Sequence, residues 1–351
     1  VKLFRCLDVG TACFAEIETS HASEMRPGRL CDPSPDNHPI DSLELGHLTP
    51  AQREEAQQML LRRHKAISRG DDDFGLTNWV VHDIELKEGC EAPAWDAQRT
   101  TPYHKRDKID TVVEDLLTKG IIEPAVSPWR SHALLVKKKR LDGSWESDGR
   151  FCLDLRSINA KTIRYSRLIP KISEVIDQLQ GSQWFSKIDL VNAYHQIPLT
   201  DSAADKTAFT VFGGKQFRFS RLCFGLVNAG NSFADLMDLV LAGLSRECAA
   251  AYLDDTVVFS KTFEEHVQHL EDVLMRFEAA GLKAKPSKCS LFQSSIELLG
   301  HKVSAQGISP EDFKVKTVEK WPQPDNLTAL RGFLSFCSFY RRSIPHFSRV
   351  A

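Results

Sequence analysis

Two adjacent carboxylates inside an apolar stretch constrain this chain more than any other feature. The run Tyr252-Leu253-Asp254-Asp255 lies between Ala249-Ala250-Ala251 and Thr256-Val257-Val258-Phe259. Small and β-branched flanks predict two short strands with the acids at the turn between them. Two like charges about 4 Å apart repel by roughly 4 kcal/mol at an effective dielectric constant near 20. A structural hairpin would use Asn-Gly or Asp-Gly without that cost, so the pair predicts a magnesium site.

A third carboxylate follows a second apolar strand. The segment Trp184–Leu190 places Asp189 near its end. On neighbouring strands, Asp189 and Asp254 could hold two Mg²⁺ about 3.5–4 Å apart, the arrangement used for in-line displacement at phosphorus. Taken singly, a strand-ending Asp is more often a solvated cap, and an Asp pair is more often a surface turn. The combination favours the metal site.

Composition limits the partners of the chain. Its 351 residues are 42% hydrophobic and carry a formal charge of −2, so a polyanion needs a local basic surface. Residues 137–171 hold ten Lys/Arg against four Asp/Glu, although such a stretch is more often a solvated face. The nine cysteines form no C-x-x-C pair, which predicts reduced thiols and an unsecreted protein. No apolar run approaches transmembrane length, so we expect no membrane partner.

The order of the predicted elements gives the fold class. Residues 1–48 read as irregular, with four prolines in Arg26–Asp41, and a helix follows from Thr49 to Gly70. Later helices are expected at 105–119, 172–179, 230–244 and 263–280, and strands or hairpins at 133–139, 150–155, 184–189, 208–219, 249–260 and around 299–302. This order predicts an α+β protein with a ferredoxin-like antiparallel sheet covered by helices on one side.

Several segments together resemble one family. They occur in the order Phe185–Ile197, Phe224–Ala229, Tyr252–Asp255 and Leu299–Ser304, with Gly120–Trp129 and Val136–Lys139 upstream and Trp321–Pro324 and Phe339–Arg342 downstream. The series is similar to the reverse transcriptases of gypsy-type LTR retrotransposons and covers roughly residues 75–350. The resemblance implies a right-hand polymerase, with a spacer at 1–75, fingers and palm at 76–304 and the start of a thumb or connection at 305–351.

The resemblance also implies an activity and its cofactor. The chain would be an RNA-directed DNA polymerase that adds deoxynucleotides to a primer 3′-hydroxyl. Asp189, Asp254 and Asp255 would hold two Mg²⁺, for which Mn²⁺ could substitute. RNA or DNA template-primer and dNTPs would be the substrates, and protease, ribonuclease H and integrase would lie on a longer Pol polyprotein. The expected location is the cytoplasm, in a virus-like particle, with the nucleus as a second location.

Further residues match the nucleotide-binding positions of the family. Lys138 and Arg150 would grip the triphosphate, with ordinary surface charge as the alternative. Tyr194, five residues after Asp189, would exclude a ribose 2′-hydroxyl, unless it is a core tyrosine. Phe224 would pack near the nucleotide.

A last group of matching residues would meet the primer. Leu299, Gly300 and His301 resemble the hairpin that steadies the primer end, although Gly300 is also a common turn residue.

The sequence departs from the family pattern at several positions. Extra residues separate the lysines from Arg150, Cys223 and Gly230 replace a usual proline, and Ala234 replaces a usual glutamine. These departures keep a second hypothesis open, a decayed or domesticated fragment that binds nucleic acid without synthesis. A related RNA polymerase or nucleotide cyclase is a third, which Tyr194 and the Tyr252–Asp255 run oppose.

Overall fold

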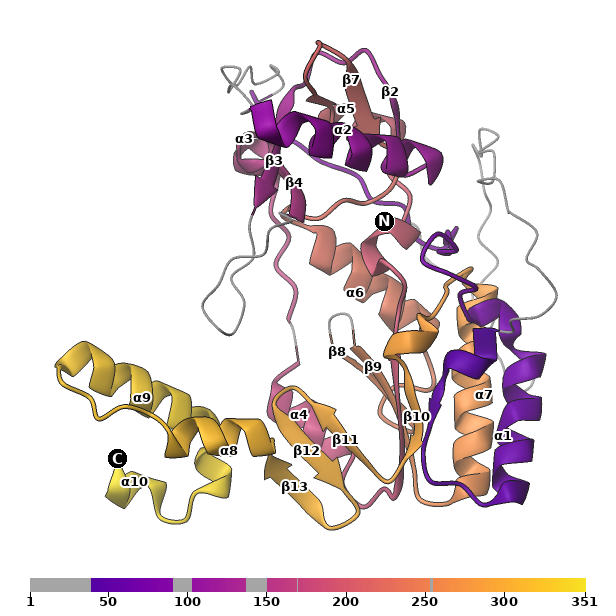
Figure 1. Ribbon diagram of the computed structural model, residues 1–351, viewed down its shortest axis with the longest axis vertical. Coiled ribbons are helices and arrows are strands. Elements are labelled where there is room, and N and C mark those ends of the chain that lie inside the picture. Colours follow the sequence, from indigo (N-terminus) through magenta and orange to yellow (C-terminus); the bar gives the residue numbers. More distant parts are fainter. Residues whose placement is uncertain (1–38, 91–102, 137–149, 169, 253–254) are drawn as a thin grey trace. The chain divides into compact units, whose positions relative to one another are not determined.

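Three sheets form the framework of the part of the chain that the computed structural model describes, residues 39–90, 103–136, 150–168, 170–252 and 255–351 (Figure 1). The first sheet contains, in spatial order, β1 (Glu44–Leu45), β10 (Ser290–Gln293), β5 (Trp184–Asp189), β9 (Asp255–Ser260) and β8 (Ala249–Tyr252). The second contains β2 (Ile122–Pro124), β7 (Gln216–Phe219), β6 (Phe209–Thr210), β3 (Ser131–Val136) and β4 (Arg150–Asp154). The third contains β11 (Ser295–Leu298), β12 (His301–Ser304) and β13 (Gly307–Pro310).

The two faces of the first sheet bury different partners. Ile188 and Val258 join the core cluster that contains the buried side chains of α6 (Ala229–Val240) and α7 (Phe263–Ala279). Their strand neighbours Phe185 and Val257 join a second cluster with α4 (Ile172–Gln178) and strands β11 and β12. The period-2 alternation of side chains along a strand produces this division. The α+β prediction is confirmed, with α6 and α7 covering one face.

Helix α7 illustrates how the sequence sets local structure. Thr262 accepts a hydrogen bond from the backbone N–H of Glu265, and the Glu265 side chain accepts from Thr262, which makes a capping box. Seven of its residues, spaced at helical intervals, are buried against the sheet and α6. Gly281, at a φ of 69°, follows the helix end, where the left-handed backbone conformation suits glycine.

Residues 39–66 pack onto the first sheet, unlike the irregular chain expected through residue 48. Strand β1 pairs in parallel with β10, and the 3-10 turn at Pro39–Ser42 precedes it. Helix α1 (Pro50–Arg62) runs beside α7, where Arg62 and Arg63 both bind Glu271 (Figure 1). The expectation of irregular structure is therefore wrong at residues 39–45, because a two-residue strand leaves no periodic signal in the sequence.

The second sheet agrees with the sequence prediction of a hairpin between the lysine-rich segment and Arg150. Strands β3 and β4 pair antiparallel from His132–Asp154 to Val136–Arg150. Helix α2 (Tyr103–Thr118) contacts this sheet, and α3 (Arg156–Lys161) and α5 (Asp201–Lys206) complete its surroundings.

Helices α8 (Asp312–Glu319), α9 (Leu327–Phe339) and α10 (Phe347–Val350) follow the third sheet. Among the described residues, no helix combines the length and the apolar character needed to cross a membrane.

Candidate active site

Two of the three predicted metal ligands face each other across neighbouring strands. Asp189, the last residue of β5, is the direct partner of Asp255, the first residue of β9. Directly opposite residues of an antiparallel pair project from the same face, with Cβ atoms about 4.5–5.5 Å apart. By strand alternation this is the face that carries Phe185 and Val257, and so the face of α4 and the β11–β12 hairpin. Cβ atoms at that separation allow the two carboxylates to reach one cation.

The third carboxylate, Asp254, lies outside the described residues, as does Leu253. The strands around it are described: Tyr252 ends β8 and pairs with Asp255, which begins β9. The two described strands, β8 and β9, form the hairpin that the sequence predicted at 249–260. Within the described ranges there is no group of three or more His, Cys, Asp or Glu that could hold a metal. Those ranges contain only two of the three predicted ligands, Asp189 and Asp255.

Two lysines that the sequence analysis did not single out offset the charges of this site. Lys187 Nζ lies 3.1 Å from Asp255 Oδ1, and Lys288 Nζ lies 3.4 Å from Asp189 Oδ1. The lysines and carboxylates are partly exposed, so each ion pair is weak. A divalent cation, which binds carboxylates more strongly, could displace the lysine ammonium groups. Lys187 had a signal in the sequence, because residues two apart on a strand share a face with Asp189. Lys288 had none, since its contact joins residues 99 apart.

The backbone around Lys288 also fixes the end of β5. The 3-10 turn at Pro286–Lys288 follows Lys285, whose N–H donates to the carbonyl of Asp189 over 2.7 Å. The buried thiol of Cys289 donates to the same carbonyl, and burial raises the pKa of this thiol to about 12. These bonds hold Asp189 at the edge of a packed core.

Tyr194 packs against two aromatic side chains, Phe224 and Phe233, which together form an aromatic box. It belongs to the 3-10 turn Ala193–Gln196, which Asn192 begins in the left-handed region at a φ of 44°. The ring meets Phe224 edge-on at 4.8 Å between centroids and Phe233 at 5.8 Å. Phe224 is 58% exposed, whereas Phe233 is buried in α6. Tyr194 is half-buried, so its ring is packed on one side and accessible on another.

Two asparagines, absent from the sequence prediction, hold the loop that carries Phe224. Asn159 donates to the carbonyl of Gly225 and accepts from the N–H of Val227. Asn228 donates to the carbonyl of Ile163 and accepts from the N–H of Tyr165. Both side chains satisfy backbone groups that no regular element would pair. Asn228 lies in the family-like segment Phe224–Ala229, whereas the only signal for Asn159 was the usual preference of asparagine for loops.

A half-buried histidine supports the same loop. His195 contacts the Phe224 ring at 5.8 Å and donates from Nδ1 to the carbonyl of Leu222. Burial lowers the pKa of His195 to about 4, so the imidazole is neutral at neutral pH. Its role is therefore packing and hydrogen bonding.

Of the two cationic residues expected to bind the triphosphate, the structure describes only Arg150. Lys138 lies outside the described residues. The backbone of Arg150 begins β4 opposite Val136, the last residue of β3, so Arg150 lies at the end of the hairpin where β3 ends and β4 begins. Its contribution to nucleotide binding stays a prediction.

The predicted primer-contacting residues form a tight turn. Leu298 pairs with His301, which leaves Leu299 and Gly300 as a two-residue connection between β11 and β12. Leu299 packs against the same core cluster as Tyr252, and that cluster lies on the face that bears Asp189. The structure therefore brings this turn to the side of the sheet that carries the carboxylates.

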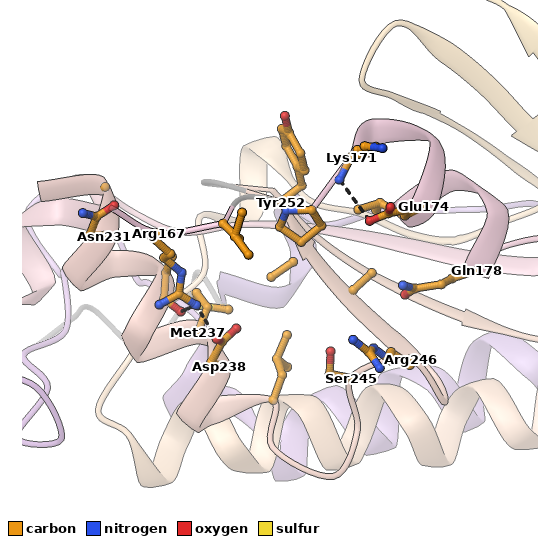
Figure 2. Close-up of a pocket in the computed structure, with 18 residues that line it drawn as sticks. Arg167, Lys171, Glu174, Gln178, Asn231, Met237, Asp238, Ser245, Arg246 and Tyr252 are labelled. Carbon is orange, nitrogen blue, oxygen red and sulfur yellow. Dashed lines mark hydrogen bonds and ion pairs between the residues drawn. The ribbon is translucent and has the colours of Figure 1, made fainter. Parts of the chain in front are cut away.

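A pocket of about 560 Å³ lies along β8, between α4 and α6 (Figure 2). Arg167 and Asp238 line one side of it and Lys171 and Glu174 another, and Tyr252 contributes to the wall. Arg167 is paired with Asp238 and Asp235, so its charge is offset within the protein. This mixed lining does not identify a ligand.

Comparison with known proteins agrees with the geometry. Residues 136–303 match the family model described as reverse transcriptase (RNA-dependent DNA polymerase). The chain is 33% identical over 273 residues to the retrovirus-related Pol polyprotein from transposon 412 of Drosophila melanogaster, and 32% identical over 299 residues to that from transposon gypsy. These alignments cover 78% and 85% of this chain, but 22% and 29% of the relatives, so the chain spans less than a third of their length.

Solved structures with a similar fold are also reverse transcriptases. The foamy viral protease-reverse transcriptase in complex with double-stranded DNA superposes with a TM-score of 0.74 at 22% identity, over 89% of this chain and 52% of that one. The complex of the foamy viral enzyme with an RNA/DNA hybrid gives 0.71 at 22% identity, over 86% and 39%. The predicted fold is thus confirmed, and the chain belongs to the reverse transcriptase family, with a domain like those of gypsy-type retrotransposon Pol polyproteins.

Proposed function

We propose that this chain extends the 3′ end of a primer with deoxynucleotides, copying an RNA or DNA template. The primer 3′-hydroxyl oxygen attacks the α-phosphorus of a dNTP, a phosphodiester bond forms, and pyrophosphate leaves. The observation that carries this proposal is the pairing of Asp189 with Asp255 on one sheet face, with Asp254 adjacent in the chain.

The carboxylates fit a hard divalent cation. Asp189 and Asp255 present oxygen ligands from the ends of two strands, and both already attract ammonium groups. We assign Asp189, Asp254 and Asp255 to Mg²⁺, with Mn²⁺ as a substitute. When bound, the ions supply the positive charge that acidifies the 3′-hydroxyl and neutralises the leaving pyrophosphate. Lys187 and Lys288 offset the carboxylate charge before a cation arrives.

The aromatic box gives Tyr194 a defined orientation. Phe224 and Phe233 both pack against its ring in T-shaped contacts, so the ring resists displacement by a sugar substituent. We assign Tyr194 to exclusion of the ribose 2′-hydroxyl and Phe224 to the nucleotide site beside it. Lys138 and Arg150 would meet the triphosphate from the β3–β4 hairpin. The division into fingers, palm and thumb follows from the same proposal.

Primer extension tests this proposal. The native chain, with an RNA template, a DNA primer, dNTPs and Mg²⁺, should extend the primer, and Asp254→Asn should lower the rate by roughly a thousandfold or more. Equal extension by both proteins would refute the catalytic assignment. No extension by either protein, with template-primer still bound, would favour a nucleic-acid-binding relic.

A second variant tests sugar selection. Tyr194→Ala should incorporate ribonucleotides at least about tenfold better relative to deoxynucleotides, because the ring that opposes the 2′-hydroxyl is gone. Competition between dNTP and rNTP in single-nucleotide extension measures this ratio. An unchanged ratio would remove the gate role of Tyr194 while leaving the metal assignment intact.

A further inference from the structure

The turn at Leu299-Gly300 adopts a conformation that its sequence does not favour. Both residues have positive φ, 52° at Leu299 and 82° at Gly300, as a type I′ hairpin requires. Asn-Gly is the usual sequence there, and a non-glycine residue in the left-handed region costs about 1–2 kcal/mol. Something outside the hairpin must therefore stabilise the turn.

The C-terminal helices supply that support through one carbonyl oxygen. The Tyr340 hydroxyl, at the end of α9, donates to the carbonyl of Gly300 over 3.2 Å. The N–H of Glu311, which caps the start of α8, donates to the same carbonyl over 3.3 Å. Two helices that follow the hairpin in the chain thus converge on a single atom of the turn.

Aromatic packing reinforces the same contact. The His301 ring lies 5.3 Å from Phe339 and 5.3 Å from Tyr340, between centroids. Tyr340 is only 7% exposed, and burial raises the pKa of its hydroxyl, so the hydroxyl stays a donor at neutral pH. The fit is close: a Cβ added at Gly300 would lie 2.9 Å from the Tyr340 hydroxyl.

The Leu299-Gly300 turn also packs against the sheet face that carries Asp189 and Asp255. Leu299 packs with Tyr252 and Ile172 against the cluster that includes Phe185 and Val257. This is the face that carries Asp189 and Asp255. A chain of contacts through Tyr340, Gly300 and Leu299 therefore joins α9 to the sheet face that carries the carboxylates.

We propose that Tyr340 is a positioning residue, whose hydrogen bond to the Gly300 carbonyl holds the Leu299–His301 turn where the primer 3′ end lies. This inference rests on the proposed function, and on the expectation from the family resemblance that the Leu299–His301 turn meets the primer. Tyr340 touches neither the substrate nor the metal ligands in this role. It sets the position of the primer terminus and leaves nucleotide binding unchanged.

The test uses Tyr340→Phe, which removes the hydroxyl and keeps the ring. Its matched control is Tyr103→Phe on the distant helix α2, where the side chain is 79% exposed. With Tyr340→Phe we expect a three- to tenfold slower extension at saturating dNTP, roughly the value of one hydrogen bond, and an unchanged KM for dNTP. A 2-aminopurine at the primer 3′ end should fluoresce more strongly in that complex, because the terminus is less well held.

A second variant tests the contact itself. Gly300→Ala should slow extension more than Tyr340→Phe does, because its Cβ meets the hydroxyl and its φ is strained. In the Tyr340→Phe background the additional loss should be several-fold smaller, since the colliding oxygen is absent. Equal losses in both backgrounds would overturn the proposal, as would native rates and native fluorescence for Tyr340→Phe.

The two proposals fail in different ways. If the native chain binds template-primer but does not extend it, the polymerase proposal fails while the fluorescence comparison still decides the role of Tyr340. If Tyr340→Phe and Tyr103→Phe alter the signal equally, Tyr340 has no specific role. If binding of the native chain leaves the fluorescence of the primer end unchanged from that of the free duplex, the proposed position of the primer is wrong.

Discussion

Helices α7 and α9 both have an apolar stripe, yet the protein uses them differently. Helix α7 buries seven side chains against the first sheet and its neighbours, whereas α9 buries only Cys337. Leu270 of α7 is fully buried, and Leu330 of α9 is 42% exposed. Helix α7 therefore belongs to the core that carries Asp189, while α9 joins the hairpin through a few contacts around Tyr340.

This difference separates two requirements of the proposed activity. The carboxylates need fixed positions, which a sheet packed on both faces provides. A primer must advance after each addition, so elements near its end need looser attachment. Regions with few buried contacts open at lower free-energy cost than a packed core.

The largest expected effect compares one leucine from each helix. Leu270→Ala should lower the free energy of unfolding by about 2–5 kcal/mol, because it leaves a cavity in a closed core. Leu330→Ala should cost roughly 0.5 kcal/mol, because water already reaches the side chain. Urea unfolding followed by circular dichroism measures both. Similar losses would mean that α9 is packed as tightly as α7.

Acid should weaken the packed body through three histidines whose pKa is lowered in the folded chain. Burial lowers the pKa of His82 and His195 to about 4 and that of His266 to about 3. In the unfolded chain each of these histidines binds a proton near pH 6.5, whereas in the folded chain it stays neutral to a lower pH. The free energy of unfolding therefore falls as pH drops below about 6.5. From pH 7.5 to 5.5 each histidine should cost about 1 kcal/mol.

Urea unfolding across this pH range measures the loss, and His266→Gln should show a shallower pH dependence than the native chain. In the native chain the two ring nitrogens of His266 are hydrogen-bonded to the hydroxyls of Ser186 and Ser260, which both lie on strands of the first sheet. A pH-independent stability between 7.5 and 5.5 would contradict the neutral state of these histidines in the folded chain.

The smallest expected effect concerns the surface link between the two regions. Arg342 lies 3.2 Å from Asp177, which follows the buried residues of α4, and both side chains are at least half exposed. Arg342→Ala should change the free energy of unfolding by less than about 0.5 kcal/mol, because water and salt screen such a pair. Thermal unfolding at low and high salt provides the measurement, and a large loss at both would reveal an additional role.

The sequence predicted the elements whose pattern is local. The helical spacing of its apolar residues predicted helix α7, and the apolar flanks of Asp254 and Asp255 predicted the β8–β9 hairpin. Strand β1 could not be predicted, because two residues carry no period and β10 alone determines their pairing. Local signals thus predicted the strands that carry Asp189 and Asp255, but not the edge strand of their sheet.

The candidate site divides in the same way. The sequence identified Asp189, and the sheet register then placed it opposite Asp255. It did not reveal Lys288 or Tyr340, whose contacts join residues 99 and 40 positions apart. Leu299 in the left-handed region was also unpredictable, since leucine disfavours that conformation and tertiary contacts impose it.

The central claim is that Asp189 and Asp255 share divalent cations on one face of the sheet. Mn²⁺ binding to the template-primer complex, followed by electron paramagnetic resonance, tests it directly in the native chain, Asp189→Asn and Asp255→Asn. Each variant should bind Mn²⁺ at least about tenfold more weakly while unfolding at the native temperature. Native affinity in both variants would contradict the shared site, whatever the rate of primer extension.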